Sequence, residues 1–99
     1  MMLREEVEWF SFEMEKVLRE NDHKTGWADM DFGDLLNRID AEEEELEEAL
    51  GGTLDDDDER DWDLVAEEAD SIVKEAVDIA NYCMFIACNA ARAKRKKVS

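Results

Sequence analysis

Two pairs of carboxylates stand three residues apart on stretches whose other residues predict helices. The first pair is Glu42 and Glu45, within RIDAEEEELEEAL, and the second is Glu75 and Asp78, within EAVDIANYC. This separation places both members of a pair on one side of a helix. An ionised carboxylate taken out of water is costly unless it is paired with a base or bound to a metal. The spacing therefore suggests a cation held between two helices.

The first pair lies on the apolar side of its helix. At about 100° per residue, Glu42 falls inside the arc that Leu35, Ile39 and Leu46 define, and Glu45 lies at the edge of that arc. We therefore expect both side chains to point inward, toward a neighbouring helix. The alternative is that Glu42 extends outward to water, because acid runs on helices usually form solvated faces.

The second pair repeats the arrangement on one flank of a later apolar arc that contains Ile72 and Ile79. Four carboxylates that meet between two helices cannot all stay charged without a cation. Sites made only of oxygen ligands suit Mg²⁺ and Mn²⁺. We therefore predict that Glu42, Glu45, Glu75 and Asp78 bind Mg²⁺, with Mn²⁺ as a substitute.

Charge is distributed very unevenly along the chain. The net charge is −17, all 29 acidic residues lie at or before Asp78, and five of the 12 basic residues lie in the segment RAKRKK at 92–97. So acidic a body repels a nucleic-acid backbone, which argues against direct nucleic-acid binding. The composition is also typical of proteins adapted to high salt, and a halophilic source is one hypothesis.

Targeting and redox signals predict a cytoplasmic protein without a membrane partner. The sequence contains no run of 18 apolar residues, and charged residues interrupt its first positions, so neither a transmembrane helix nor a signal peptide is expected. Cys83 and Cys88 are five apart on a predicted helix, where they cannot pair with each other. We interpret them as free thiols, which suits a reducing compartment.

The chain lacks proline, and its apolar spacing predicts an all-α domain. Helices are expected at about 2–20, at about 31–51 and at about 63–94. We place a helical domain at 1–93 and a basic, disordered tail at 94–99. The third helix carries two apolar stripes, more than two short helices can cover. We therefore expect a bundle of three main helices that homo-oligomerisation completes, as a homodimer or homotetramer.

Three stretches of the sequence are similar to a known family. LLNRIDAEEEELEEAL (35–50) and EAVDIANYCMFIACNA (75–90) resemble the ExxE and ExxD motif helices of the all-α nucleoside triphosphate pyrophosphohydrolases, the MazG-like group, and HKTGW (23–27) resembles the segment before the first motif. The chain departs from the family pattern at Ala41, where a second acid often stands, and in a long gap between the motifs.

The resemblance implies an Mg²⁺-dependent enzyme that cleaves a nucleoside triphosphate between its α and β phosphates, giving the monophosphate and pyrophosphate. Glu42 and Glu45 are then the catalytic candidates, with Glu45 as the base that activates water. Four further residues are candidates for substrate binding: Lys24, Trp27, Asn81 and Tyr82. The alternatives are a metal-binding but inactive family member and a non-enzymatic acidic helical module that serves protein interactions.

Overall fold

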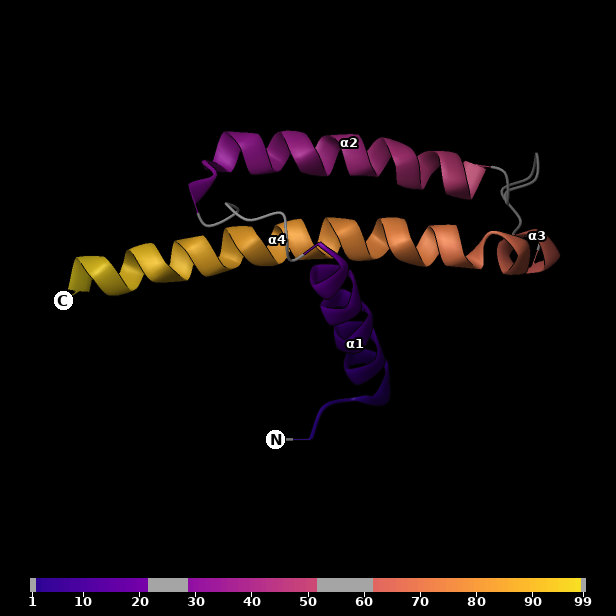
Figure 1. Ribbon diagram of the computed structural model, residues 1–99, viewed down its shortest axis with the longest axis horizontal. Helices are drawn as coiled ribbons and strands as arrows, with labels where there is room; N and C mark the ends of the chain where they lie inside the picture. Colours follow the sequence, from indigo (N-terminus) through magenta and orange to yellow (C-terminus); the bar gives the residue numbers. More distant parts are fainter. Residues whose placement is uncertain (1, 22–28, 52–61, 99) are drawn as a thin grey trace.

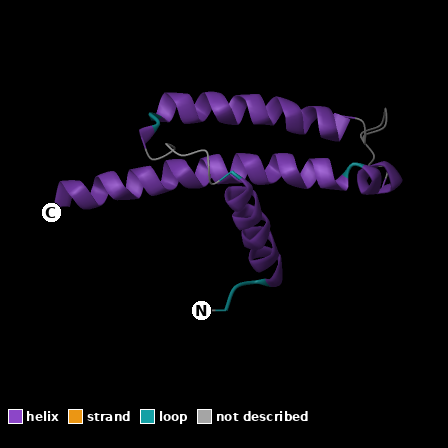
Figure 2. Ribbon diagram, viewed as in Figure 1, coloured by secondary structure: helices purple, strands orange, loops and turns teal. Residues whose placement is uncertain are grey.

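The computed structural model describes residues 2–21, 29–51 and 62–98, and all of the regular structure in these ranges is helical (Figure 2). The helices, in chain order, are α1 (Glu5–Glu20), α2 (Phe32–Gly51), α3 (Trp62–Glu67) and α4 (Ala69–Val98). The all-α prediction is therefore confirmed. Among the described residues, no helix is both long and apolar enough to span a membrane.

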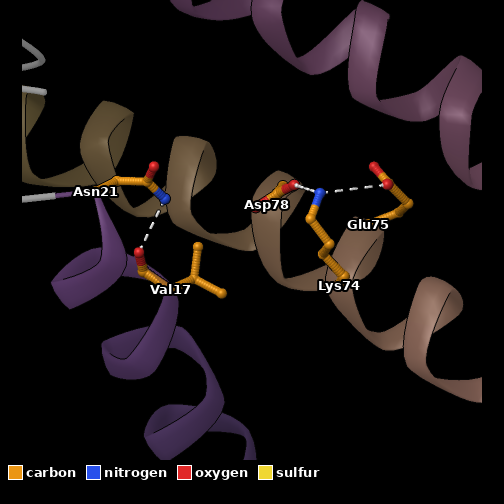
Figure 3. Close-up of polar contacts among 5 residues, drawn as sticks. All are labelled: Val17, Asn21, Lys74, Glu75 and Asp78. Atoms are coloured by element: carbon orange, nitrogen blue, oxygen red, sulfur yellow. Dashed lines mark hydrogen bonds and ion pairs between the residues drawn. The ribbon is translucent and has the colours of Figure 1, made fainter.

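The ends of α1 and α2 follow from short polar side chains. At the end of α1, Asn21 donates from Nδ2 to the Val17 carbonyl at 2.9 Å, which satisfies one of the carbonyls that a helix terminus leaves open (Figure 3). At the start of α2, Asp31 accepts a hydrogen bond from the Asp34 backbone N–H at 2.8 Å, as an N-cap does. The predicted boundaries of both helices are met within three residues.

The predicted third helix is divided into α3 and α4 by a turn at Glu68. Backbone hydrogen bonds bridge the turn, from the Glu68 N–H to Leu64 O at 3.0 Å and from the Ile72 N–H to Glu68 O at 2.9 Å. α4 continues to Val98, beyond the predicted end of the helix at about residue 94 and into the segment expected to be a basic tail. Its lysines and arginines are good helix formers, and their charges suit the negative end of the helix dipole.

The arrangement of the helices is set by α4, the longest of them. In Figure 1, α2 lies alongside α4 in the opposite direction, whereas α1 leaves α4 on the other side at a steep angle. Within residues 2–21, 29–51 and 62–98, the buried apolar side chains come from α2 and α4: Leu35, Val77 and Phe85. The predicted bundle of three main helices is thus not closed within one chain, since α2 and α1 contact different sides of α4.

Many large apolar side chains remain exposed around this small core. On α1 the exposed fractions reach 50% for Trp9 and 65% for Phe12, and on α2 Leu36 is 55% exposed. None of the residues of α1 is buried. A chain with 44% hydrophobic residues therefore covers little of its apolar surface by itself.

Candidate metal centre

Three of the four predicted carboxylates meet between α2 and α4. Glu42 comes from α2, and Glu75 and Asp78 come from successive turns of α4. Each offers a carboxylate oxygen, and these oxygens all lie within 4.8 Å of one another. The antiparallel pairing in Figure 1 brings the middle of α2 beside the N-terminal half of α4, so that residues 33 or more positions apart become neighbours.

The three carboxylates are mostly shielded from water, unlike the other acids of α2. The side chains of Glu75 and Asp78 are only 14% and 18% exposed, and Glu42 is half-buried. Glu42 Oε2 and Glu75 Oε2 are buried without any hydrogen-bond partner. Buried polar atoms normally have such a partner, so these two oxygens could accept either a proton shared between them or a cation.

The surroundings of Glu42 strongly oppose its ionisation. Burial raises the pKa of Glu42 from 4.5 to about 8, helped by a hydrogen bond to Glu75 and by the negative charges of Asp78 and Glu45. A hydrogen bond between two carboxyl groups requires a proton, so it exists only while Glu42 is protonated. With both groups ionised, the oxygens repel each other and lose that contact. The site therefore holds a proton when it holds no other positive charge.

Within the part of the chain that the structure describes, Lys74 is the base that contacts the cluster. Lys74 Nζ lies 3.4 Å from Asp78 Oδ2 and 3.6 Å from Glu75 Oε1 (Figure 3). The negative charges of Asp78 and Glu75 raise the pKa of Lys74. Because the Lys74 side chain is 64% exposed, the ion pairs are screened by water and contribute little to stability. The lysine reaches only the outer oxygens, and the buried ones stay unpaired.

The donor set fits a hard divalent cation. All three ligand atoms are carboxylate oxygens, which Mg²⁺, Mn²⁺ and Ca²⁺ prefer. The three oxygens lie within 4.8 Å of one another, so Glu42, Glu75 and Asp78 together could hold one such ion.

Glu45 does not belong to the cluster of three. It is exposed on α2, one turn beyond Glu42, and lines an adjacent hollow of about 440 Å³ with five other residues: Glu48, Ala49, Glu68, Ser71 and Glu75. Glu75 belongs to both the hollow and the cluster. The cluster therefore borders an open space lined by acidic residues. The roles predicted for Glu45, as a metal ligand and as a base, stay predictions.

Two substrate-binding candidates on α4 make contacts within the protein. Asn81 is 5% exposed and donates from Nδ2 to the Met14 carbonyl of α1 at 3.4 Å, while its Oδ1 is buried without a hydrogen-bond partner. Tyr82 is half-buried and meets the Phe85 ring edge-on at 5.9 Å. Both residues lie one turn after Asp78, but Asn81 faces α1 whereas the cluster faces α2.

The other two candidates, Lys24 and Trp27, lie outside the described residues. Sequence reasoning missed Lys74 as the base beside the cluster, although a lysine four residues before Asp78 is a standard ion-pair spacing on a helix. It also missed Glu68 and Ser71 in the hollow, and no local sequence signal distinguishes them from other surface residues.

No protein-family model matches the chain, and no curated protein or solved structure is significantly similar to it. The resemblance to the MazG-like pyrophosphohydrolases therefore depends on the quoted motifs alone. The cluster itself depends on the geometry of α2 and α4.

Proposed function

We propose that the protein is an Mg²⁺-dependent nucleoside triphosphate pyrophosphohydrolase of the MazG-like kind. The observation that supports this best is the meeting of Glu42, Glu75 and Asp78, with two buried, unpartnered oxygens, on the positions of the family's two motifs. In the proposed reaction, water adds across the anhydride bond between the α and β phosphates. The products are a nucleoside monophosphate and pyrophosphate.

The three clustered carboxylates would hold Mg²⁺, or Mn²⁺ in its place. When bound, the ion supplies charge neutralisation for the triphosphate and lowers the pKa of a coordinated water. Without positive charge, so acidic a site would repel an anionic substrate. The protein's part is to fix the carboxylates on two packed helices, so that little reorganisation is needed at the moment of reaction.

Glu45 is the proposed base that takes the proton of the attacking water. It is exposed at the rim of the hollow beside Glu75, so its carboxylate is hydrated and outside the cluster of ligands. A base must be close to the reacting water and still free to accept a proton. An exposed glutamate next to three committed ligands meets both conditions.

The nucleoside would be recognised by Tyr82 on α4 and by Lys24 and Trp27 before α2, since a tryptophan or tyrosine ring offers a face for base stacking. Asn81 is buried against α1, on a different side of α4 from the cluster, and is the weakest of the four candidates. We further propose that the enzyme works as a homo-oligomer, because one chain leaves many large apolar side chains exposed. Its proposed location is the cytoplasm.

The direct test is to incubate the purified protein with a panel of ribonucleoside and deoxyribonucleoside triphosphates and Mg²⁺, and to assay pyrophosphate and monophosphate. Pyrophosphate release from at least one nucleotide is expected. Release of orthophosphate alone, or of no product, would contradict the proposal. Metal binding without turnover would indicate an inactive relative, and neither binding nor turnover would indicate a non-enzymatic acidic module.

Two variants of α2 separate the site from general acidity. Glu42→Gln removes a clustered carboxylate and should reduce pyrophosphate release at least 100-fold. Glu44→Gln makes the same change on the exposed far side of α2 and should leave the rate within twofold. Circular dichroism should show equal helix content for both. Equal activity of the two variants would remove the cluster from the mechanism.

A further inference from the structure

The chain exposes much more surface than a compact monomer of its size. Its accessible surface is 7969 Å² for a mass of 11.5 kDa, whereas a folded monomer of that mass exposes about 5,800 Å². Stable protein interfaces cover about 800 Å² on each partner, and obligate dimers cover more. The excess, on the order of 2,000 Å², is therefore large enough for an obligate interface with a second copy.

One side of the α2–α4 pair carries apolar residues from both helices. On α2 these are Phe32, Leu36 and Leu50, which are 48%, 55% and 37% exposed and lie about 60–100° round the helix from Leu35. On α4 a second stripe follows 4-3 spacing and lies about 180–240° round the helix from Val77. Its residues are half-buried or exposed: Ile72, Ile79, Cys83, Ile86 and Ala90.

Both stripes are on the same side of the pair. On each helix, the stripe lies about 80–90° round the helix from the side that contacts the other helix. The sense of this rotation is the same on both helices. Two antiparallel helices that pack together are related by a twofold axis perpendicular to the plane that contains both helices. Surfaces that lie at the same angle, in the same sense, from the contact side of each helix are therefore on the same side of that plane. The stripes thus form one mainly apolar face, which Glu43 interrupts on α2 at about 80° round from Leu35. It is not the side that α1 contacts through Asn81.

The two ends of the α2–α4 pair carry opposite charge. At one end, the last turns of α4 carry five bases: Arg92, Lys94, Arg95, Lys96 and Lys97. At the other end lie ten carboxylates, six on α2 and four on α3 and the start of α4: Glu42, Glu43, Glu44, Glu45, Glu47, Glu48, Asp63, Glu67, Glu68 and Asp70. A copy that binds end-reversed places the basic end against the acidic end, whereas a copy in the same direction places like charges together.

We propose that the apolar face of α2 and α4 binds the same face of a second copy in the reversed direction, so that the two α4 helices cross the interface antiparallel. By the helical wheel, Lys94 and Lys97 lie on the α4 stripe side, and Glu43 and Glu47 lie beside Leu36 on α2. Reversal about residue 81, the midpoint of the stripe, brings Lys94 of one copy opposite residue 68 of the second, at the acidic end. The proposal does not depend on any enzymatic activity.

The first experiment locates the face by light scattering. The wild-type chain should have twice the mass of 11.5 kDa. Leu36→Glu, on the face, should raise the dimer dissociation constant at least 100-fold. Phe12→Glu, on α1 and more exposed than Leu36, is the matched control and should leave it unchanged. A monomeric wild type, or a dimer that only Phe12→Glu disrupts, would overturn the proposal.

The second experiment uses the two natural cysteines, both of which are exposed. Cys83 lies two residues from residue 81, the midpoint of the stripe, so two copies of Cys83 come close in a reversed dimer. Cys88 lies about 140° away round the helix, and two copies of it would be about 20 Å apart along α4. A short bismaleimide should cross-link wild type and Cys88→Ser, but not Cys83→Ser. Cross-linking through Cys88 alone would contradict the arrangement.

The third experiment tests the direction of the second copy. Lys94→Gln with Lys97→Gln removes two positive charges from the basic end, and Arg4→Gln with Lys16→Gln removes two from outside the face. If the dimer is reversed, the dissociation constant of the Lys94/Lys97 variant should be at least fivefold higher than that of the Arg4/Lys16 control. This difference should shrink at high salt. Tighter association of the Lys94/Lys97 variant would mean that the basic ends lie together, which overturns the proposed direction.

Discussion

Leu35 and Glu42 stand one heptad apart on the same stripe of α2, and the structure treats them very differently. Leu35 is fully buried, with no exposed surface. Glu42 faces the same neighbour, α4, and meets Glu75 and Asp78 there. On the side of α2 that contacts α4, the position of Leu35 serves packing, whereas the position of Glu42 carries an ionisable group. The second arrangement lowers the stability of the empty protein, since buried like charges repel and their oxygens lack partners.

The difference indicates why the acids stand where a leucine would pack better. A structural ion pair would need a base that reaches the buried oxygens, and Lys74 contacts the cluster only from its exposed side. A cation bound from solution, as we propose, would provide the missing charge.

Leu35→Ala should lower the free energy of unfolding by about 2–5 kcal/mol, because it leaves a cavity in a core of only three buried apolar side chains. Urea denaturation followed by circular dichroism measures this. Leu3→Ala, which makes the same change at a position that is 52% exposed and outside the apolar face of α2 and α4, is the control and should cost less than Leu35→Ala. Equal losses for the two variants would mean that Leu35 does not carry the core.

Glu42→Leu should raise the free energy of unfolding of the metal-free protein by about 1–3 kcal/mol, because an apolar side chain replaces a buried carboxyl group whose Oε2 has no hydrogen-bond partner. The same variant should lose all stabilisation by Mg²⁺ at constant ionic strength. Thermal melts with EDTA and with Mg²⁺ measure both effects. A loss of stability without metal would show that Glu42 supports the fold rather than a cation site.

The metal-free protein should become less stable as pH rises toward about 8. Folding raises the pKa of Glu42 from 4.5 to about 8, so the folded state binds more protons than the unfolded state in this window. The stability that protonated Glu42 provides is complete below pH 4.5 and disappears as pH passes about 8.

Melting temperatures between pH 5.5 and 8.5 test the prediction about protonation. The slope should be steeper in wild type than in Glu42→Gln, whose amide cannot ionise, and saturating Mg²⁺ should flatten the wild-type slope. Glu44→Gln corrects for the general loss of negative charge and should keep the wild-type slope. Parallel slopes for wild type and Glu42→Gln would contradict the role of this proton.

Lys74→Gln should have the smallest effect. The metal-free protein should lose at most about 1 kcal/mol, because the lysine is largely exposed. The affinity for Mg²⁺ should rise a fewfold, since a positive charge that competes for Asp78 and Glu75 is gone. Isothermal titration calorimetry measures the change. Weaker Mg²⁺ binding would mean that Lys74 positions the ligands instead of competing with the ion.

The sequence was sufficient for the helices and for the inward position of Glu42, because both follow from apolar spacing within one segment. It did not predict the turn at Glu68, since Ala66, Glu67 and Ala69 are all good helix formers and local propensity favours continuation. It also placed Glu45 with the ligands, where the structure leaves it at the rim of the hollow. The edge of an apolar arc does not decide which way a long side chain turns.

The contacts of Asn81 could not be predicted from spacing either. Its hydrogen bond to the Met14 carbonyl joins residues 67 positions apart and depends on the angle at which α1 crosses α4. Helical periodicity says which side of a helix is covered, but not by which partner. For the same reason, the apolar spacing of α4 indicated a need for more partners without saying on which face they bind.

The most direct test of the central claim is Mg²⁺ calorimetry on metal-free wild type, Glu42→Gln and Glu44→Gln at one fixed ionic strength. If the clustered carboxylates of α2 and α4 hold the cation, wild type and Glu44→Gln should bind with equal affinity, and Glu42→Gln should bind at least tenfold more weakly. If all three proteins bind alike, the ion is attracted by the acidic surface as a whole, and the account of Glu42 is wrong.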